Sequence, residues 1–319
     1  MILYILYIIV GAACVLFGAD KMTDGSVAVA RKMRISPLVI GLTILAIGTS
    51  APEFSVSLFS AIKGTPDMAV GNVIGSNILN ILLVGGVSAC VMPLTTSRET
   101  MVRQMPIMAV ASVVLMVLCL DGMLSRWDCL LLFIGFVLFM IYTVRNAKES
   151  EKKGVTAATS DTAEQKEEKP YPTGKAILFI LAGLSLLVLG SNVFVNGASA
   201  LAKELGVSEA VIGLTIVAGG TSLPELATSV VAAYKGQTDI ALGNIIGSNV
   251  FNILMALGLT GIISPMRVDG FTPIDFGIML LSAALLWIFT FSKRTLERWE
   301  GGVLVAICVG YLWYLVASV

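Results

Sequence analysis

One apolar segment of this 319-residue chain occurs twice, and each copy carries a glutamate in the middle of an apolar run. With a shift of 172 positions, residues 38–87 align without a gap on residues 210–259, and 28 of the 50 positions are identical. The first run, 35–62, is long enough to cross a bilayer. A carboxylate at membrane depth costs about 2.5–3.5 kcal/mol on insertion scales. Glu53 and Glu225 are therefore predicted to be functional residues.

The glutamates sit in the hexapeptides GTSAPE (48–53) and GTSLPE (220–225). Pro52 has no N–H, and its ring clashes with the carbonyl of Gly48, so the helix is predicted to break just before the acid. Such a break frees backbone carbonyls and two hydroxyls beside a negative charge. Oxygens of these kinds bind hard cations such as Ca²⁺ and Na⁺.

A second motif follows each hexapeptide, GNVIGSNILN (71–80) in the first copy and GNIIGSNVFN (243–252) in the second. Duplicated segments interrupted by Gly and Pro, at matching positions of two halves, point to a transporter site at the repeat interface. For Asn72 and Asn244, roles as ion ligands and as groups that lock a hinge both stay open.

The composition indicates a polytopic, all-α membrane protein. Apolar residues make up 56% of the chain, charged residues 13%, and the mean hydropathy is +0.91. The lack of histidine excludes imidazole ligands and Ser-His-Asp triads. The five cysteines show no CxxC spacing and are interpreted as packing residues. A net charge of zero gives no indication of nucleic-acid binding.

The apolar runs predict ten transmembrane helices. These cover residues 2–29, 36–62, 68–92, 101–120, 127–145, 174–201, 209–234, 239–263, 272–292 and 300–318. The polar segment 146–172 is predicted to be a solvated linker. It separates a first five-helix repeat (1–145, with its motif region at 38–87) from a second (173–319, with its motif region at 210–259).

The distribution of Lys and Arg predicts the orientation. Loops on the side of the linker carry sixteen of these residues, and the opposite loops carry four. The linker is therefore predicted to be cytoplasmic, with both termini outside. Residues 1–19 have no basic start and are expected to be a retained helix rather than a signal peptide. Asp20, Lys21 and Asp24, at the end of the first run, are expected to form a solvated or interfacial cluster.

Five helices per half make the two copies cross the membrane in opposite directions. The fold class is thus predicted to be ten helices in two inverted five-helix repeats, with Glu53 and Glu225 close together near the midplane. Two adjacent carboxylates repel each other unless a proton or a cation lies between them. A divalent ion neutralises both, so Ca²⁺ fits this pair better than a single Na⁺.

The two hexapeptides, each followed by GN-x-I-GSN-x-x-N, resemble the repeats of the sodium/calcium exchanger family of the calcium/cation antiporter superfamily, here a prokaryotic member. The resemblance covers essentially the whole chain. It implies that Glu53 and Glu225 share the Ca²⁺ ion, assisted by the backbone carbonyls of Thr49 and Thr221. The full candidate set of metal ligands is Glu53, Glu225, Thr49, Thr221, Ala46, Ala218, Ser50, Ser222, Ser76, Ser248, Asn80 and Asn252.

Within that set, the resemblance implies flanking Na⁺ sites formed by Ala46 with Ser76 and by Ala218 with Ser248, while Asn80 lines the site. Some relatives carry Asp where this chain has Asn252, so two carboxylates are available here rather than three. This argues against K⁺ co-transport. Gly219 also departs from symmetry with Ile47 and adds room or flexibility beside the second break.

The resulting prediction is a monomeric secondary antiporter of the cell (inner) membrane that exports Ca²⁺ in exchange for Na⁺ by alternating access. Its partners are these ions and the lipid bilayer, and no cofactor is implied because no nucleotide motif is present. The first and sixth predicted helices are expected to slide past the core.

Three rival functions compete with this prediction, and nothing in the residue types excludes the first of them. A Ca²⁺/H⁺ exchanger would use the two glutamates as proton carriers. A cation channel usually builds its acids into a ring of identical subunits, and here the acids come from two halves of one chain. A membrane-embedded enzyme would need a nucleophile pair or metal-hydrolase spacing beside the glutamates, and the sequence has neither.

Overall fold

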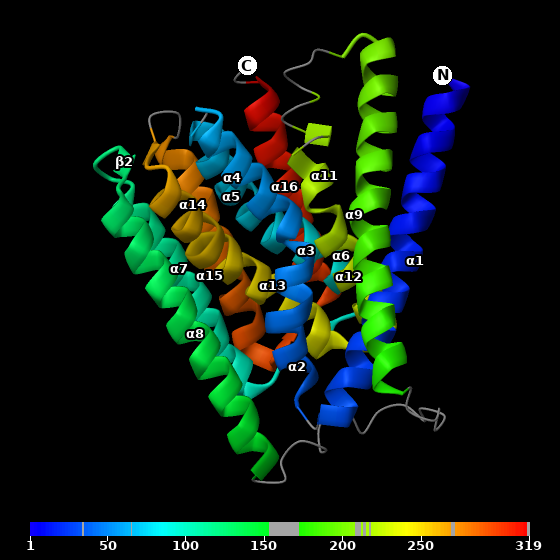
Figure 1. Ribbon diagram of the computed structural model, residues 1–319, viewed down its shortest axis with the longest axis vertical. Helices are drawn as coiled ribbons and strands as arrows, with labels where there is room; N and C mark the ends of the chain where they lie inside the picture. The colour runs from blue at the N-terminus through cyan, green and yellow to red at the C-terminus, as the bar shows by residue number, and fades with distance from the viewer. Residues whose placement is uncertain are drawn as a thin grey trace.

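The computed structural model describes residues 1–33, 35–64, 66–152, 172–207, 212, 215–216, 218–268 and 272–317, and these form a bundle of long helices (Figure 1). Eight of the described helices are long and apolar enough to span a membrane. A ninth span results when the bent pair 37–49 and 51–62 is counted as one. The tenth expected span, 209–234, lies partly outside the described residues.

The first half of the chain runs from α1 to α8, and π-helical turns carry the symbol η. Its helices are α1 (Ile2–Met33), α2 (Pro37–Ile40), η1 (Gly41–Leu45), α3 (Ala46–Thr49), α4 (Ala51–Ile62), α5 (Pro66–Leu79), η2 (Asn80–Gly85), α6 (Gly86–Val91), η3 (Thr100–Gln104), α7 (Met105–Leu118) and α8 (Arg126–Lys152). Its strands are β1 (Leu94–Thr95) and β2 (Met123–Leu124).

The second half follows the same plan. Its helices are α9 (Thr173–Glu204), α11 (Ala218–Thr221), α12 (Leu223–Tyr234), α13 (Thr238–Val250), η6 (Phe251–Leu257), α14 (Gly258–Ile263), α15 (Pro273–Lys293) and α16 (Arg298–Ala317). Its strands are β3 (Met266–Arg267) and β4 (Thr295–Leu296).

Helix α8 continues past the expected end at residue 145 to Lys152. The added residues include Ala, Lys and Glu, which are good helix formers, so the helix continues after the apolar run has ended. Residues 153–171 of the expected linker lie outside the described residues.

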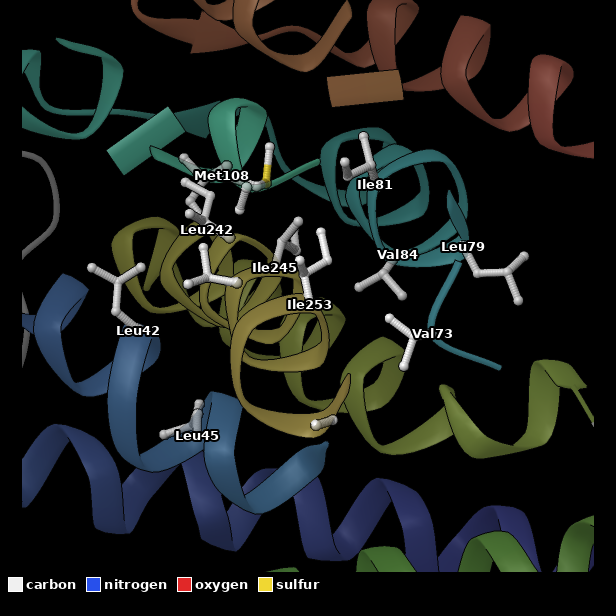
Figure 2. Packing of buried hydrophobic residues seen from close by; sticks show 14 of the residues in the cluster. Leu42, Leu45, Val73, Leu79, Ile81, Val84, Met108, Leu242, Ile245 and Ile253 are labelled. Atoms are coloured by element: carbon white, nitrogen blue, oxygen red, sulfur yellow. The ribbon is translucent and has the colours of Figure 1, made fainter. Parts of the chain in front are cut away.

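The core consists of two long helical rods, α5–η2–α6 and α13–η6–α14. In the most apolar 18-residue stretch of each rod, 78% and 83% of the residues, respectively, are buried inside the protein. In Figure 2, Ile81 and Val84 of η2 lie across from Ile245 of α13 and Ile253 of η6. This central position brings the second motif of each half into the interior.

Helices α1 and α9 form a separate pair along one side of the bundle (Figure 1). A Cβ added at Gly18 would lie 2.7 Å from the backbone oxygen of Gly183, and one at Gly190 would lie 3.0 Å from that of Gly11. The two helices are therefore antiparallel and in backbone contact. In the most apolar 18-residue stretch of each helix, only 22% and 28% of the residues are buried, which makes the pair peripheral there, whereas α1 is mostly buried from Gly18 to Ala30.

Two short antiparallel ladders join the two halves. Leu94 of β1 pairs with Leu296 of β4, and Leu124 of β2 pairs with Met266 of β3. Under the shift of 172 residues, β1 corresponds to β3 and β2 corresponds to β4. The β1–β4 ladder of one half-to-half junction therefore corresponds to the β3–β2 ladder of the other. Strands of two residues carry no alternating pattern, so they could not be predicted from the sequence.

Candidate functional site

Each copy of the hexapeptide contains the predicted helix break. The first bends by 44° between Thr49 and Ala51. The residue at the bend, Ser50, has φ −86° and ψ 5°, and its counterpart Ser222 has the same two angles. A proline follows in the first turn of each new helix, so Glu53 and Glu225 lie in the first turns of α4 and α12. The first turn of a helix favours negative charge because of the helix dipole.

The two breaks are connected by reciprocal hydrogen bonds. Ser50 Oγ donates to Glu225 Oε1 over 2.8 Å, and Ser222 Oγ donates to Glu53 Oε1 over 3.5 Å. Both carboxylates are fully buried and close enough to repel each other. The hydroxyl of Thr221 also lies against Glu53. The serine of each copy thus holds the acid of the other copy.

The second oxygen of each carboxylate has no protein partner. Glu53 Oε2 and Glu225 Oε2 are both buried and unpaired among the described residues. The side-chain oxygen and nitrogen atoms of Asn80 and Asn252 are also buried without partners, as is Ser248 Oγ. Buried polar atoms almost always have partners, so a group of unpaired oxygens indicates a place for a bound cation or water.

A second group of amides holds the broken helices in position. The amide nitrogen of Asn72 donates to the backbone oxygen of Glu53 and to Ser57 Oγ, each over 3.0 Å. Asn244 donates to Ser229 Oγ over 3.0 Å and accepts from Thr49 Oγ1 over 3.2 Å. These contacts favour the helix-locking role that the sequence left open for Asn72 and Asn244.

The first break packs closely against α13 of the other half. A Cβ added at Gly247 would lie 2.7 Å from the Cβ of Ala46, and one at Gly41 would lie 2.9 Å from the Cα of Gly243. On its other side, Gly48 faces Met22 of α1 and Leu184 of α9, at 3.1 and 3.5 Å from an added Cβ. The break therefore lies between the core and the peripheral pair.

The predicted site residues fall into three groups. Glu53, Glu225, Ser50, Ser222, Thr49 and Thr221 take part in the contacts around the two carboxylates. Asn80, Asn252 and Ser248 contribute unpaired polar atoms, and Ser76 is also buried. Ala46 accepts the backbone N–H of Ser50, while Ala218 begins α11.

Two further pairs of buried polar residues lie outside the candidate set of ligands, and the sequence reasoning missed the second pair altogether. The amide nitrogens of Asn77 and Asn249 donate to the backbone oxygens of Val73 and Ile245, each over 2.7 Å. The side-chain oxygen of each asparagine is buried and unpaired among the described residues. The second pair, Ser57 and Ser229, accepts the hydrogen bonds that the amides of Asn72 and Asn244 donate. All four are identical between the two copies, and this identity is the signal that could have revealed them.

The donor set contains two carboxylates and otherwise neutral oxygens. Among the described residues, no group of three or more His, Cys, Asp and Glu side chains gathers that could hold a metal ion. The arrangement can bind a hard cation that one oxygen from each glutamate approaches, with amide and hydroxyl oxygens around it.

Comparison with known proteins assigns the chain to a family. The family model "Sodium/calcium exchanger protein" matches residues 3–145 and 175–317. The chain belongs to this family. Members of it are transporters rather than enzymes, and this chain is a membrane transporter with no cofactor-binding fold indicated.

Full-length relatives share about a third of its residues. The "Putative antiporter CaxA" of Alkalimonas amylolytica is 38% identical, with 100% of both chains covered. "Inner membrane protein YrbG" of Escherichia coli is 37% identical over 96% of this chain and 94% of the relative. "Sodium/calcium exchanger MaX1" of Methanosarcina acetivorans is 33% identical over 96% and 97%.

The fold also matches solved structures of the sodium-calcium exchanger NCX_Mj. A structure soaked with Na⁺ and Sr²⁺ has a TM-score of 0.82 at 30% identity and covers 100% of this chain and 98% of that one. A structure soaked without Na⁺ and Ca²⁺ has a TM-score of 0.83 at 30% identity, with 99% of both chains covered. The helical arrangement is therefore that of the family.

Proposed function

We propose that this protein is a secondary antiporter that exports Ca²⁺ in exchange for Na⁺, with the Ca²⁺ ion shared by Glu53 and Glu225. The observation that carries the proposal is the pair of fully buried carboxylates, each bonded to the other copy's serine through one oxygen and unpaired at the second. Two buried like charges need a counter-charge between them.

The proposal of Ca²⁺ rests on charge and on ligand number. One divalent ion neutralises both carboxylates, and Ca²⁺ takes six to eight oxygen ligands in flexible geometry. The unpaired oxygens of Asn80 and Asn252, together with carbonyls at the breaks, are available to supply the remaining ligands. Na⁺ is a hard cation that takes the same kinds of oxygen, so the two ions would compete and be carried in turn. The flanking Na⁺ sites are proposed at Ala46 with Ser76 and at Ala218 with Ser248.

For alternating access, we propose that the peripheral pair α1–α9 slides along the core. Three observations support this motion. The pair packs mainly on itself, the most apolar stretch of each of its helices is little buried, and it touches the first break through small contacts at Gly48. A shift of 172 residues maps the β1–β4 ladder onto the β3–β2 ladder, and this supports two inverted repeats. In a transporter built from inverted repeats, the two halves can exchange conformations, so that the site opens to one side of the membrane or to the other.

The proposed orientation follows from the charge count in the loops. The segment 146–172 is proposed to be cytoplasmic and both termini external, with the two five-helix repeats at 1–145 and 173–319. The functional unit is proposed to be a monomer, because both halves of the site come from one chain.

The deciding experiment is uptake of ⁴⁵Ca²⁺ into proteoliposomes loaded with Na⁺, beside vesicles that carry only a pH gradient. We expect uptake that needs internal Na⁺ and that Glu53→Gln abolishes. Ser55→Ala is a matched control, because this exposed serine of α4 bonds only to its own helix. Uptake driven by the pH gradient alone would replace Na⁺ by H⁺ as the coupled ion. Undiminished uptake by Glu53→Gln would refute the proposed site.

A further inference from the structure

An ion-pair network ties α1 to the end of α12. Lys235, which directly follows the last residue of α12, bonds Asp20 over 2.5 Å and Asp24 over 2.6 Å, and also donates to the backbone oxygen of Asp20 over 3.3 Å. Lys21 pairs with the same two acids over 2.9 and 3.7 Å. The side chains of Lys235, Asp20 and Asp24 are only 27%, 36% and 28% exposed. The network thus contains two acids and two lysines and is partly buried.

The network flanks the residue of α1 that covers the candidate site. Met22 lies between the two acids in the sequence, is fully buried, and reaches Gly48 at the first break. Lys21 extends the contact to α9, because its Nζ lies 5.6 Å from the ring centroid of Phe179. These ion pairs therefore hold the segment of α1 around Met22, which packs against the first helix break.

Among the described residues, the equivalent position of the other half has no such network. With the shift of 172 residues, Lys235 corresponds to Lys63, and the two acids correspond to Asn192 and Asn196. Lys63 is exposed, and among the described residues no carboxylate lies within ion-pair distance of it. Asn192 bonds only to the carbonyl of Val188 in its own helix. One of the two lysines at equivalent positions is paired, and the other is not.

We propose that Lys235, Asp20 and Asp24 form a one-ended latch that favours one of the two facing states of the transporter. The inference rests on the proposed movement of α1–α9 past the core. A slide of α1 along α12 separates Lys235 from its acids and moves Met22 off Gly48. In the opposite facing state, each inverted repeat takes the conformation that the other has here, so Lys63 approaches Asn192 and Asn196. These two amides carry no charge and form no ion pair with Lys63. The latched state is therefore the more populated one at rest.

Distances between two spin labels test the latch without any ion gradient. One label is placed on the exposed native Cys90, the other on Lys32→Cys, in a Cys14→Ala background in which the remaining cysteines are buried. We expect two distance populations, and Lys235→Gln should lower the ratio of latched to unlatched molecules by about threefold or more. Lys63→Gln is the matched control and should leave the ratio unchanged. Equal effects of the two variants, or no effect of either, would overturn the latch.

A second variant shifts the same ratio by adding charge. Asn192→Asp combined with Asn196→Asp supplies the missing acids to Lys63 and should stabilise the unlatched state. In an Asp20→Asn background, the charge exchange Asp24→Lys with Lys235→Asp should restore the latched population that Lys235→Gln loses. A ratio that stays fixed in both would contradict the inference. The distances are independent of which ion is carried, so failure of the proposed Ca²⁺/Na⁺ exchange in the uptake assay leaves this result readable.

Discussion

The two halves of this protein agree at the centre and differ at the ends. At the breaks, Ser50 and Ser222 have the same backbone angles and bond the opposite glutamate. At the ends of the following helices, Lys235 is held by two acids, and Lys63 is solvent-exposed. Both lysines stand at the same position of the duplicated segment.

This difference separates two demands on a duplicated transporter. In the proposed site, the two halves share one cation and supply equivalent oxygens to it, so we expect substitutions at the centre to be matched. In the proposed latch, the ends need no such match, because they affect only the balance between the two facing states. A change there alters the balance and leaves the ligands in place.

The largest effect should come from the central acids. We expect Glu225→Gln to lower Ca²⁺ transport as severely as Glu53→Gln, by a hundredfold or more, because removal of one charge of a buried set costs about 3–5 kcal/mol. Measurement of ⁴⁵Ca²⁺ exchange by the two variants would test whether their losses of transport are equal. Glu300→Gln controls for loss of a buried carboxylate elsewhere, since Glu300 is 5% exposed and caps α16. A small loss of transport in only one of the two variants would show that the two glutamates do not contribute equally to the site.

An intermediate effect is expected at the two amides with unpaired atoms. Asn80→Ala and Asn252→Ala should each raise the half-saturating Ca²⁺ concentration by about tenfold, since each removes one neutral oxygen ligand. Titration of exchange against Ca²⁺ would give both values. Ser185→Ala is a suitable control, because this exposed serine bonds only to Leu181 of its own helix. Values that differ by more than tenfold between the two asparagines would mean that only one of them faces the ion.

The smallest effect should follow when the second break is made more like the first. Gly219→Ile installs the residue that the first copy has at position 47, and no heavy atom lies within 4 Å of a Cβ added there. A substitution without clashes changes stability by less than about 0.5 kcal/mol, so the exchange rate should change by less than about twofold. Stopped-flow measurement of exchange would detect more. A large loss would show that the second break needs the flexibility of glycine.

Much of this architecture could be predicted from local chemistry. The apolar runs predict the described spans to within a few residues at most ends, and Pro52 predicts the bend that the structure has before Glu53. The duplication predicts that serines and asparagines of both motifs contribute to one region. These signals are readable because each depends on a residue and its near neighbours.

Other features depend on pairs that are far apart in the chain. The ladder of Leu94 with Leu296 joins short strands with no periodic pattern. Asp20 and Asp24 were expected to be a solvated or interfacial cluster, and their partner Lys235 is more than two hundred residues away. The π-helical turns, such as η2 after Leu79, have no residue pattern from which they could be predicted, and turns of this kind occur frequently at functional sites.

The pairing of β1 with β4 also determines when this molecule can be completed. β1 leaves the ribosome with Thr95, and its partner begins at Thr295, only after all but one of the described helices have been made. At 5–20 residues per second, that delay is roughly 10–40 s. During this interval the first half waits in the bilayer with an unpaired strand at its edge. Final assembly is therefore a late, whole-chain event, and chaperones and proteases of the membrane have this interval in which to act on the unfinished protein.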